Sequence, residues 1–83
     1  MSKLVSYIVI DPDDNALVYF TTSVSDKKFL SENGYNLYEV TSLSQLYNTL
    51  DELGYSYEYI EEFIENRISS VDRLTLELQD REN

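Results

Sequence analysis

The chain has 83 residues, of which 42% are hydrophobic, and its 16 acidic and six basic side chains give a net charge of −10. This composition is typical of one small globular domain. The acidity argues against direct binding of nucleic acid or anionic lipid, because both bind to clusters of Lys and Arg. His and Cys are absent, which excludes a disulfide framework, thiolate catalysis and most transition-metal sites. We expect a single cytoplasmic domain over residues 1–83 with no cofactor, no metal and no membrane partner.

Two strands joined by a hairpin turn are expected first. Residues 4–10 (LVSYIVI) and 16–22 (ALVYFTT) are rich in β-branched and aromatic side chains, as strands are. The five residues between them, 11–15 (DPDDN), are typical of a turn. The same segment has oxygen-bearing side chains at the first, third and fifth positions of a calcium loop, but Ala16 and Thr22 stand where such a loop needs Gly and Glu. A turn is therefore favoured over a metal site.

A short helix and a third strand are expected next. Ser25 is predicted to cap the helix, which runs to Ser31 before Gly34 ends it. Residues 35–40 are the candidate for the third strand. A crossing from the second strand through this helix places the third strand on the far side of the first. We therefore expect an α+β fold of order ββαβαα, with a small three-stranded antiparallel sheet of strand order 2-1-3 and its helices on one face.

Two further helices are expected in the second half of the chain. Ser42 and Gln45 have the spacing of a capping box, and the helix behind them is predicted to end at Gly54. Ser56 is expected to cap a long C-terminal helix. The sequence predicts that this last helix is continuous over residues 57–80.

Apolar residues recur at intervals of seven along the last helix, a spacing typical of a coiled-coil seam. A helix of this length is roughly 36 Å long, so we expect residues 69–83 to extend past the sheet. Because exposed apolar stripes mark interaction sites, we expect this segment to form a homodimer. One alternative stays open: residues 74–78 (LTLEL) alternate at period two and would form a fourth strand after a break at Ser69 and Ser70. The residues assigned to self-association are Ile64, Val71, Leu74 and Leu78.

Negative charge is concentrated in the middle of the chain, where residues 29–66 hold eight acids and no base. Asp51 and Glu52 stand at the C-terminal end of a predicted helix, where the helix dipole favours cations, and Glu58 repels Glu62 at a spacing of four. Such a run is usually a solvated face, but locally unfavourable charges tend to mark functional sites. The acids assigned to partner binding are Asp51, Glu52, Glu58, Glu61, Glu62 and Glu65.

Tyrosines accompany these acids. Tyr47 and Tyr57 are expected in the apolar core stripes, whereas Tyr55 and Tyr59 fall outside them and are candidates for partner contact, since Tyr is enriched at interfaces. We expect a non-catalytic module that docks on a basic, nucleic-acid-binding surface of a partner protein as a nucleic-acid mimic. Small viral and mobile-element inhibitors of nucleic-acid enzymes offer an electrostatic analogy.

Two other classes of function stay open. The first is a structural or assembly protein that acts through its apolar C-terminal helix, with the acidity serving only solubility. The second is a carboxylate metal enzyme, which is disfavoured because a chain of this size has little room for a deep pocket. We expect no catalytic residues.

Overall fold

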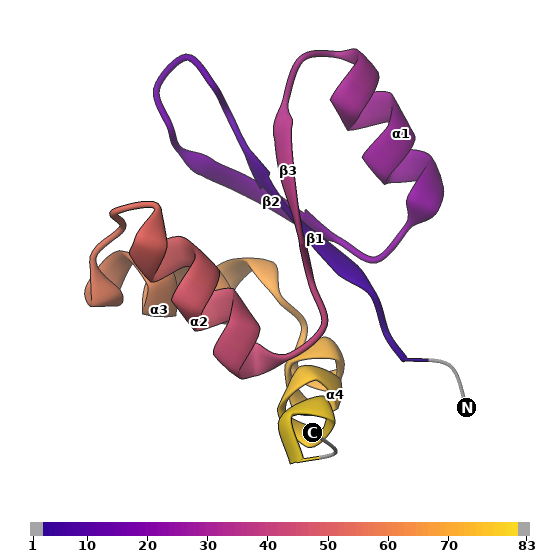
Figure 1. The fold of residues 1–83 in the computed structure, drawn as a ribbon, viewed down its shortest axis with the longest axis vertical. Helices are drawn as coiled ribbons and strands as arrows, with labels where there is room; N and C mark the ends of the chain where they lie inside the picture. Colours follow the sequence, from indigo (N-terminus) through magenta and orange to yellow (C-terminus); the bar gives the residue numbers. More distant parts are fainter. Residues whose placement is uncertain (1–2, 82–83) are drawn as a thin grey trace. The chain divides into compact units, whose positions relative to one another are not determined.

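The computed structural model describes residues 3–81, which form three strands and four helices (Figure 1). In chain order these are β1 (Ser6–Ile10), β2 (Leu17–Thr21), α1 (Val24–Glu32), β3 (Asn36–Val40), α2 (Leu43–Glu52), α3 (Tyr57–Arg67) and α4 (Ser70–Arg81). The α+β class with a small three-stranded antiparallel sheet is confirmed. The chain divides into two compact units, residues 5–40 and the remainder.

The first unit is built on the sheet, in which β1 is the central strand. It pairs antiparallel with β2 and with β3, so the predicted strand order 2-1-3 is confirmed. All five residues of β1 are buried, as expected for a central strand. The hydroxyl of Ser6 donates to the carbonyl oxygen of Val40 at 2.9 Å, which satisfies this buried polar side chain.

The hairpin between β1 and β2 is closed by backbone and carboxylate hydrogen bonds. The Asp11 N–H donates to the Ala16 carbonyl at 3.0 Å, and the Asn15 N–H donates to the Asp11 carbonyl at 2.8 Å. The carboxylates of Asp11 and Asp14 each accept a backbone N–H two residues further on. Asn15 has a φ of 58°, a left-handed conformation that Asn tolerates. These hydrogen bonds show that residues 11–15 form a turn.

Helix α1 begins two residues earlier than predicted. Its cap is Ser23, whose hydroxyl accepts from the Asp26 N–H at 3.2 Å, so the assignment of the cap to Ser25 is wrong. The reason lies in Thr21, whose hydroxyl donates to the Asp26 carboxylate and accepts from the Ser23 N–H. This arrangement fixes Asp26 in the first turn and leaves Ser25 inside the helix.

Helices α1 and α2 end in the same way, at glycines with left-handed backbone. Gly34 has a φ of 90° and Gly54 a φ of 94°. Each glycine N–H donates to the carbonyl three residues before it, and the N–H of the following tyrosine donates to the carbonyl five residues before it. This is the Schellman motif, and it confirms the helix ends predicted at both glycines.

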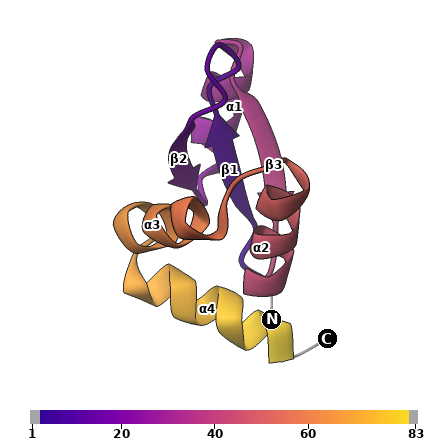
Figure 2. The ribbon, with the colours of Figure 1, turned by 90° about the vertical axis from the view of Figure 1, so that its left-hand side faces the viewer.

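The second unit contains α2, α3 and α4. The caps of the first two are as predicted, because the Ser42 hydroxyl accepts from the Gln45 N–H and the Ser56 hydroxyl accepts from the Tyr59 N–H. Helix α2 packs against both α3 and α4, as Figure 2 shows. The buried residues of these helices are Leu46, Leu50, Ile60, Phe63, Ile64, Leu76 and Gln79.

The prediction of one continuous helix over residues 57–80 is wrong. Helix α3 ends at Arg67, and Ile68 is extended and only 3% exposed. The Ser69 hydroxyl then accepts from the Asp72 N–H at 3.2 Å and so caps α4. The chain breaks here because Ser69 starts a new helix and because the extended conformation allows Ile68 to be buried. The alternative strand over residues 74–78 is also wrong, because these residues lie in α4, and the element order is ββαβααα.

Helix α4 is attached to its own unit by two adjacent side chains. The buried Gln79 accepts the Leu4 N–H at 2.6 Å, donates to the Leu4 carbonyl at 3.1 Å and also donates to the Thr41 carbonyl. The Asp80 carboxylate accepts the Ser44 N–H at 3.0 Å in the first turn of α2, where negative charge is favoured. Self-association through residues 69–83 stays a prediction.

Candidate interaction surface

The acids assigned to partner binding lie on α2 and α3, and all but the half-buried Glu61 are exposed. On α3 their spacings of three and four place them along one side of the helix, because each residue turns by about 100°. The buried residues Ile60, Phe63 and Ile64 lie on the other side of α3. We call the exposed set the acidic surface; its members are Asp51, Glu52, Glu58, Glu62 and Glu65.

The connection between the two helices keeps the acids of α2 and α3 close in the chain. Helix α2 has no basic residue in its last turn, so Asp51 and Glu52 stand unopposed at its carbonyl end. Four residues later Ser56 caps α3, and Glu58 occupies the first turn of α3, where the helix dipole favours negative charge. The helix dipole therefore favours Glu58 at the start of α3 and disfavours Asp51 and Glu52 at the end of α2.

Basic side chains do not neutralise the acidic surface. Arg81 pairs with Glu77 on α4 at 3.6 Å, but none of the five acids forms an ion pair within the part of the chain that the structure describes. The negative field of this surface is therefore directed into solvent, where it is screened over about 8 Å at physiological ionic strength.

Four tyrosines form two ring pairs beside these acids. Tyr47 of α2 stacks on Tyr57 of α3, with ring centroids 5.9 Å apart and an angle of 18° between the planes. Tyr55 and Tyr59 form the second pair at 5.6 Å. The expectation that Tyr57 lies in the core is wrong, because 66% of this residue is exposed. Its ring packs on Tyr47, which is itself only half-buried.

Glu61 has a different environment from its neighbours on α3. Hydrogen bonding from Tyr57 and from Tyr47, with the positive charge of Arg73, holds the pKa of Glu61 below its usual value. Burial raises the pKa of Tyr47 to about 12, with a further contribution from Glu61. The bond to Glu61 likewise raises the pKa of Tyr57. Sequence spacing could not separate Glu61 from the other acids, because all four follow the same periodicity.

The residues assigned to self-association are divided between two environments. Ile64 is only 3% exposed, within the core of its unit. Val71, Leu74 and Leu78 of α4 are exposed and share one side of the helix by their spacings of three and four. Since α3 and α4 are separate helices, no continuous seam joins Ile64 to the other three.

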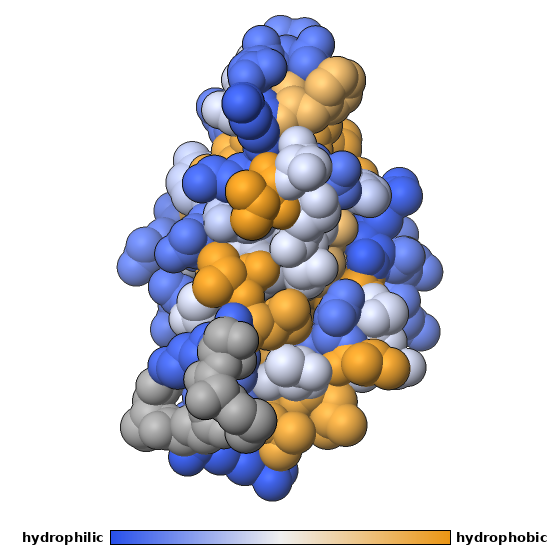
Figure 3. All heavy atoms as spheres, turned by 90° about the vertical axis from the view of Figure 1, so that its right-hand side faces the viewer, coloured by the Kyte–Doolittle hydropathy of each residue, from blue (hydrophilic) through white to orange (hydrophobic). Residues whose placement is uncertain are grey.

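Helix α1 also exposes apolar side chains. Val24 and Phe29 are 70% and 65% exposed, and the helix has no buried residue. Figure 3 shows hydrophobic side chains among hydrophilic ones on the side of the molecule where α1 lies in Figure 1. These positions gave no sequence signal, because α1 has too few turns to establish a clear apolar stripe.

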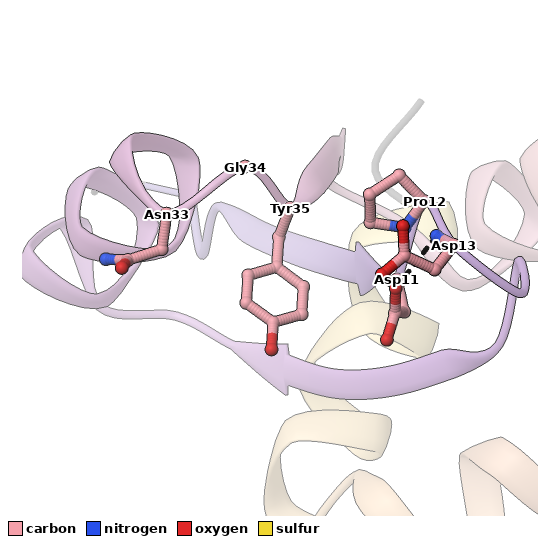
Figure 4. A pocket seen from close by; sticks show the side chains of 6 residues that line it. All are labelled: Asp11, Pro12, Asp13, Asn33, Gly34 and Tyr35. Carbon is pink, nitrogen blue, oxygen red and sulfur yellow. Dashed lines mark hydrogen bonds between the residues drawn. The ribbon is translucent and has the colours of Figure 1, made fainter.

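A hollow of about 330 Å³ lies between the hairpin turn and the end of α1 (Figure 4). In this view the side chains of Asp11 and Tyr35 point in the same direction, whereas the amide of Asn33 points away from them and donates to the Phe29 carbonyl. One oxygen of Asp11 is already bonded to the Asp13 N–H. The residues that line the hollow are Asp11, Pro12, Asp13, Asn33, Gly34 and Tyr35.

Neither a metal centre nor a membrane span is found in the described residues. No three or more acidic, His or Cys side chains within residues 3–81 are grouped so that they could hold a metal ion. None of the helices in this part of the chain has the length and apolar character needed to cross a membrane. Comparisons with known protein families, curated proteins and solved structures found no match.

Proposed function

We propose that this protein is a non-catalytic interaction module that docks its acidic surface on a basic, nucleic-acid-binding surface of a partner protein. The proposal is carried by one observation: five exposed carboxylates lie on α2 and α3, and none of them forms an ion pair with a basic side chain among residues 3–81. Carboxylates presented in this way take the place of phosphates for the Lys and Arg side chains of the partner. The protein acts as a nucleic-acid mimic, and blocks or regulates the site that it occupies.

The local energetics support this assignment. Glu58 and Glu62 repel each other by about 0.2–0.5 kcal/mol in the free protein, and Asp51 and Glu52 oppose the dipole of α2. A cationic partner removes both costs on binding. Exposed ion pairs contribute only about 0–1 kcal/mol each, so the exposed rings of Tyr57 and Tyr59 supply contact area that charge alone does not.

Charge reversal tests the proposal. Glu58, Glu62 and Glu65 are changed together to Lys in a protein used to capture partners from cell lysate at low and high salt. Asp13, Glu32 and Glu39 are equally exposed, and their joint change to Lys is the matched control because it alters the net charge by the same amount. We expect the wild type and the control to retain the same basic proteins at low salt and to release them at high salt. Unchanged capture by the Glu58/Glu62/Glu65 variant would contradict the proposal.

A second candidate function is assembly through α4. Val71, Leu74 and Leu78 give this helix an exposed apolar side, and its two Arg and three acids nearly balance. In a chain of net charge −10, a nearly neutral surface is where a second copy is repelled least. The occupant that we propose is therefore another copy of this chain.

Sedimentation velocity over a range of concentrations tests this second candidate. We expect the wild type to dimerise and a Leu74→Glu, Leu78→Glu variant to stay monomeric. The matched control changes Val24 and Phe29 of α1 to Glu, which alters two apolar residues on another helix that are more exposed than Leu74 and Leu78. A wild-type protein that is monomeric at every concentration would rule out assembly through α4.

A further inference from the structure

The two pairs of tyrosine rings beside the acidic surface each have a fixed geometry. Tyr47 of α2 stacks on Tyr57 of α3, with the ring centroids 5.9 Å apart and 18° between the planes. Tyr55 lies in the connection between these helices, and its ring is 5.6 Å from that of Tyr59, at an angle of 33°. Favourable aromatic pairs have separations of about 4.5–7 Å. Each ring is therefore held by its neighbour, and less conformational freedom is lost when a partner binds there.

Helix periodicity places the acids of α3 between the two ring pairs. Successive residues of an α-helix turn by about 100°, so Tyr57 and Tyr59 lie about 100° to either side of Glu58. Glu62 lies one turn after Glu58, on the same side of the helix. The exposed fractions of Tyr57 and Tyr59 are 66% and 37%. A partner that reaches these carboxylates therefore also meets aromatic rings on both sides of them.

Each ring pair also has a carboxylate one turn away on the same helix. Asp51 follows Tyr47 by four residues on α2, and Glu62 follows Tyr59 by three residues on α3. Residues at these spacings have Cβ atoms about 5–6 Å apart. Both acids are exposed, and neither forms an ion pair among residues 3–81. A cation that lies against one of these rings can therefore reach a carboxylate at the same time.

This combination of ring and carboxylate favours one of the two basic side chains. The guanidinium of Arg is planar, so its face stacks on an aromatic ring while the N–H groups at its edge donate to a carboxylate. The ammonium of Lys is a compact, strongly hydrated charge and has no such face. Cation–π contacts in proteins are accordingly made more often by Arg than by Lys. The rings, more than the acids, are the part of this surface that distinguishes the two cations.

We infer that the tyrosine pairs make the acidic surface selective for arginine. Its occupant is an Arg-rich segment of the partner protein, whose guanidinium groups stack on Tyr57 and Tyr59 and bind the carboxylates of Glu58 and Glu62. This inference rests on the proposed function and extends it, because charge alone selects a basic partner without selecting the basic residue. The positive charge of the occupant follows from complementarity with the exposed acids, and its planar form follows from the rings.

Two peptides of equal length and charge, octa-arginine and octa-lysine, provide the test. Their dissociation constants for the whole chain are measured by calorimetric titration at low and high salt. We expect octa-arginine to bind at least about fivefold more tightly, since one or two exposed cation–π contacts give an advantage of this size. Equal, salt-sensitive binding of both peptides would overturn the inference and leave the proposed function intact. Binding of neither peptide would overturn both.

Removal of the rings separates their role from that of the charge. A variant with Tyr57→Leu and Tyr59→Leu keeps apolar side chains at both positions but has no aromatic face there. We expect its affinities for the two peptides to differ by less than about twofold, because no cation–π contact remains at either position. Tyr19→Leu is the matched control, since it changes a tyrosine of β2 that is 45% exposed, and it should keep the wild-type preference. A Tyr57/Tyr59 variant that still prefers octa-arginine would overturn the inference.

An NMR titration of the wild type tests the same contacts without any variant. The ring protons of Tyr57 and Tyr59 should shift when octa-arginine binds and shift less with octa-lysine, because a guanidinium stacks on the ring. The ring protons of Tyr19 should not respond to either peptide. Rings of Tyr57 and Tyr59 that do not respond to bound octa-arginine would overturn the inference, even if the Leu variant fails to fold.

Discussion

At the scale of single residues, the buried amide of Gln79 holds α4 in place through hydrogen bonds, whereas other buried side chains act through hydrophobic contact. Gln79 is only 6% exposed, and its side chain bonds the backbone of Leu4 and of Thr41. Buried polar groups are retained when their hydrogen bonds are made and are costly when they are not. Gln79 therefore fixes α4 in one position.

We predict that Gln79→Leu lowers the free energy of unfolding by about 1–3 kcal/mol, because it leaves the partly buried backbone groups of Leu4 and Thr41 without the side chain that bonds them. Glu77→Gln changes an exposed residue of the same helix and should change the stability by less than about 0.5 kcal/mol. Urea unfolding followed by circular dichroism measures both. Equal stabilities of the two variants would show that the Gln79 contacts do not hold α4.

At the scale of elements, the glycines at the ends of α1 and α2 are required by backbone conformation and not by space. A Cβ atom added at Gly34 or Gly54 would meet nothing within 4 Å. The left-handed φ of each position alone disfavours other residues, by roughly 1–2 kcal/mol for Ala.

We predict that Gly54→Ala lowers the free energy of unfolding by about 1–2 kcal/mol. Gly54→Asn should cost less, because Asn tolerates the left-handed region. Chemical denaturation of both variants provides the measurement. An Ala variant as stable as the wild type would mean that α2 ends differently from the Schellman motif described above.

The elements that the sequence predicted correctly are those with local signals. Ser42, Ser56 and the two helix-ending glycines act within a few residues of their own position, and the apolar run of β1 is sufficient to identify a central strand. The break at Ile68 was missed because the heptad pattern continues across it. Only the burial of Ile68 and the cap at Ser69 decide against a continuous helix.

The candidate site was predictable in its charges but not in its contacts. The acids of α3 are visible as a periodic run in the sequence, whereas the bonds of Glu61 require Tyr47 from another helix. Gln79 is a polar residue in an amphipathic helix and would be assigned to solvent from its sequence alone. Its partner Leu4 lies 75 residues away in the sequence, so no pattern among neighbouring residues could predict this contact.

At the scale of the whole molecule, the charge distribution is the basis of the proposed choice of partner. The net charge of −10 comes mainly from residues 29–66, and the five acids of the acidic surface are exposed without ion pairs in the described residues. A field of one sign steers a cationic partner and repels an anionic one. The account therefore predicts a partner that normally binds nucleic acid.

Competition by nucleic acid is the most direct test of this account. Partners captured on the immobilised wild-type protein at low salt are challenged with short DNA or RNA duplexes, and with a neutral polymer as the control. The account predicts that nucleic acid releases the partner while the neutral polymer does not, because duplex and acidic surface compete for the same cations. A partner that binds nucleic acid while it stays attached to this protein would contradict the central claim.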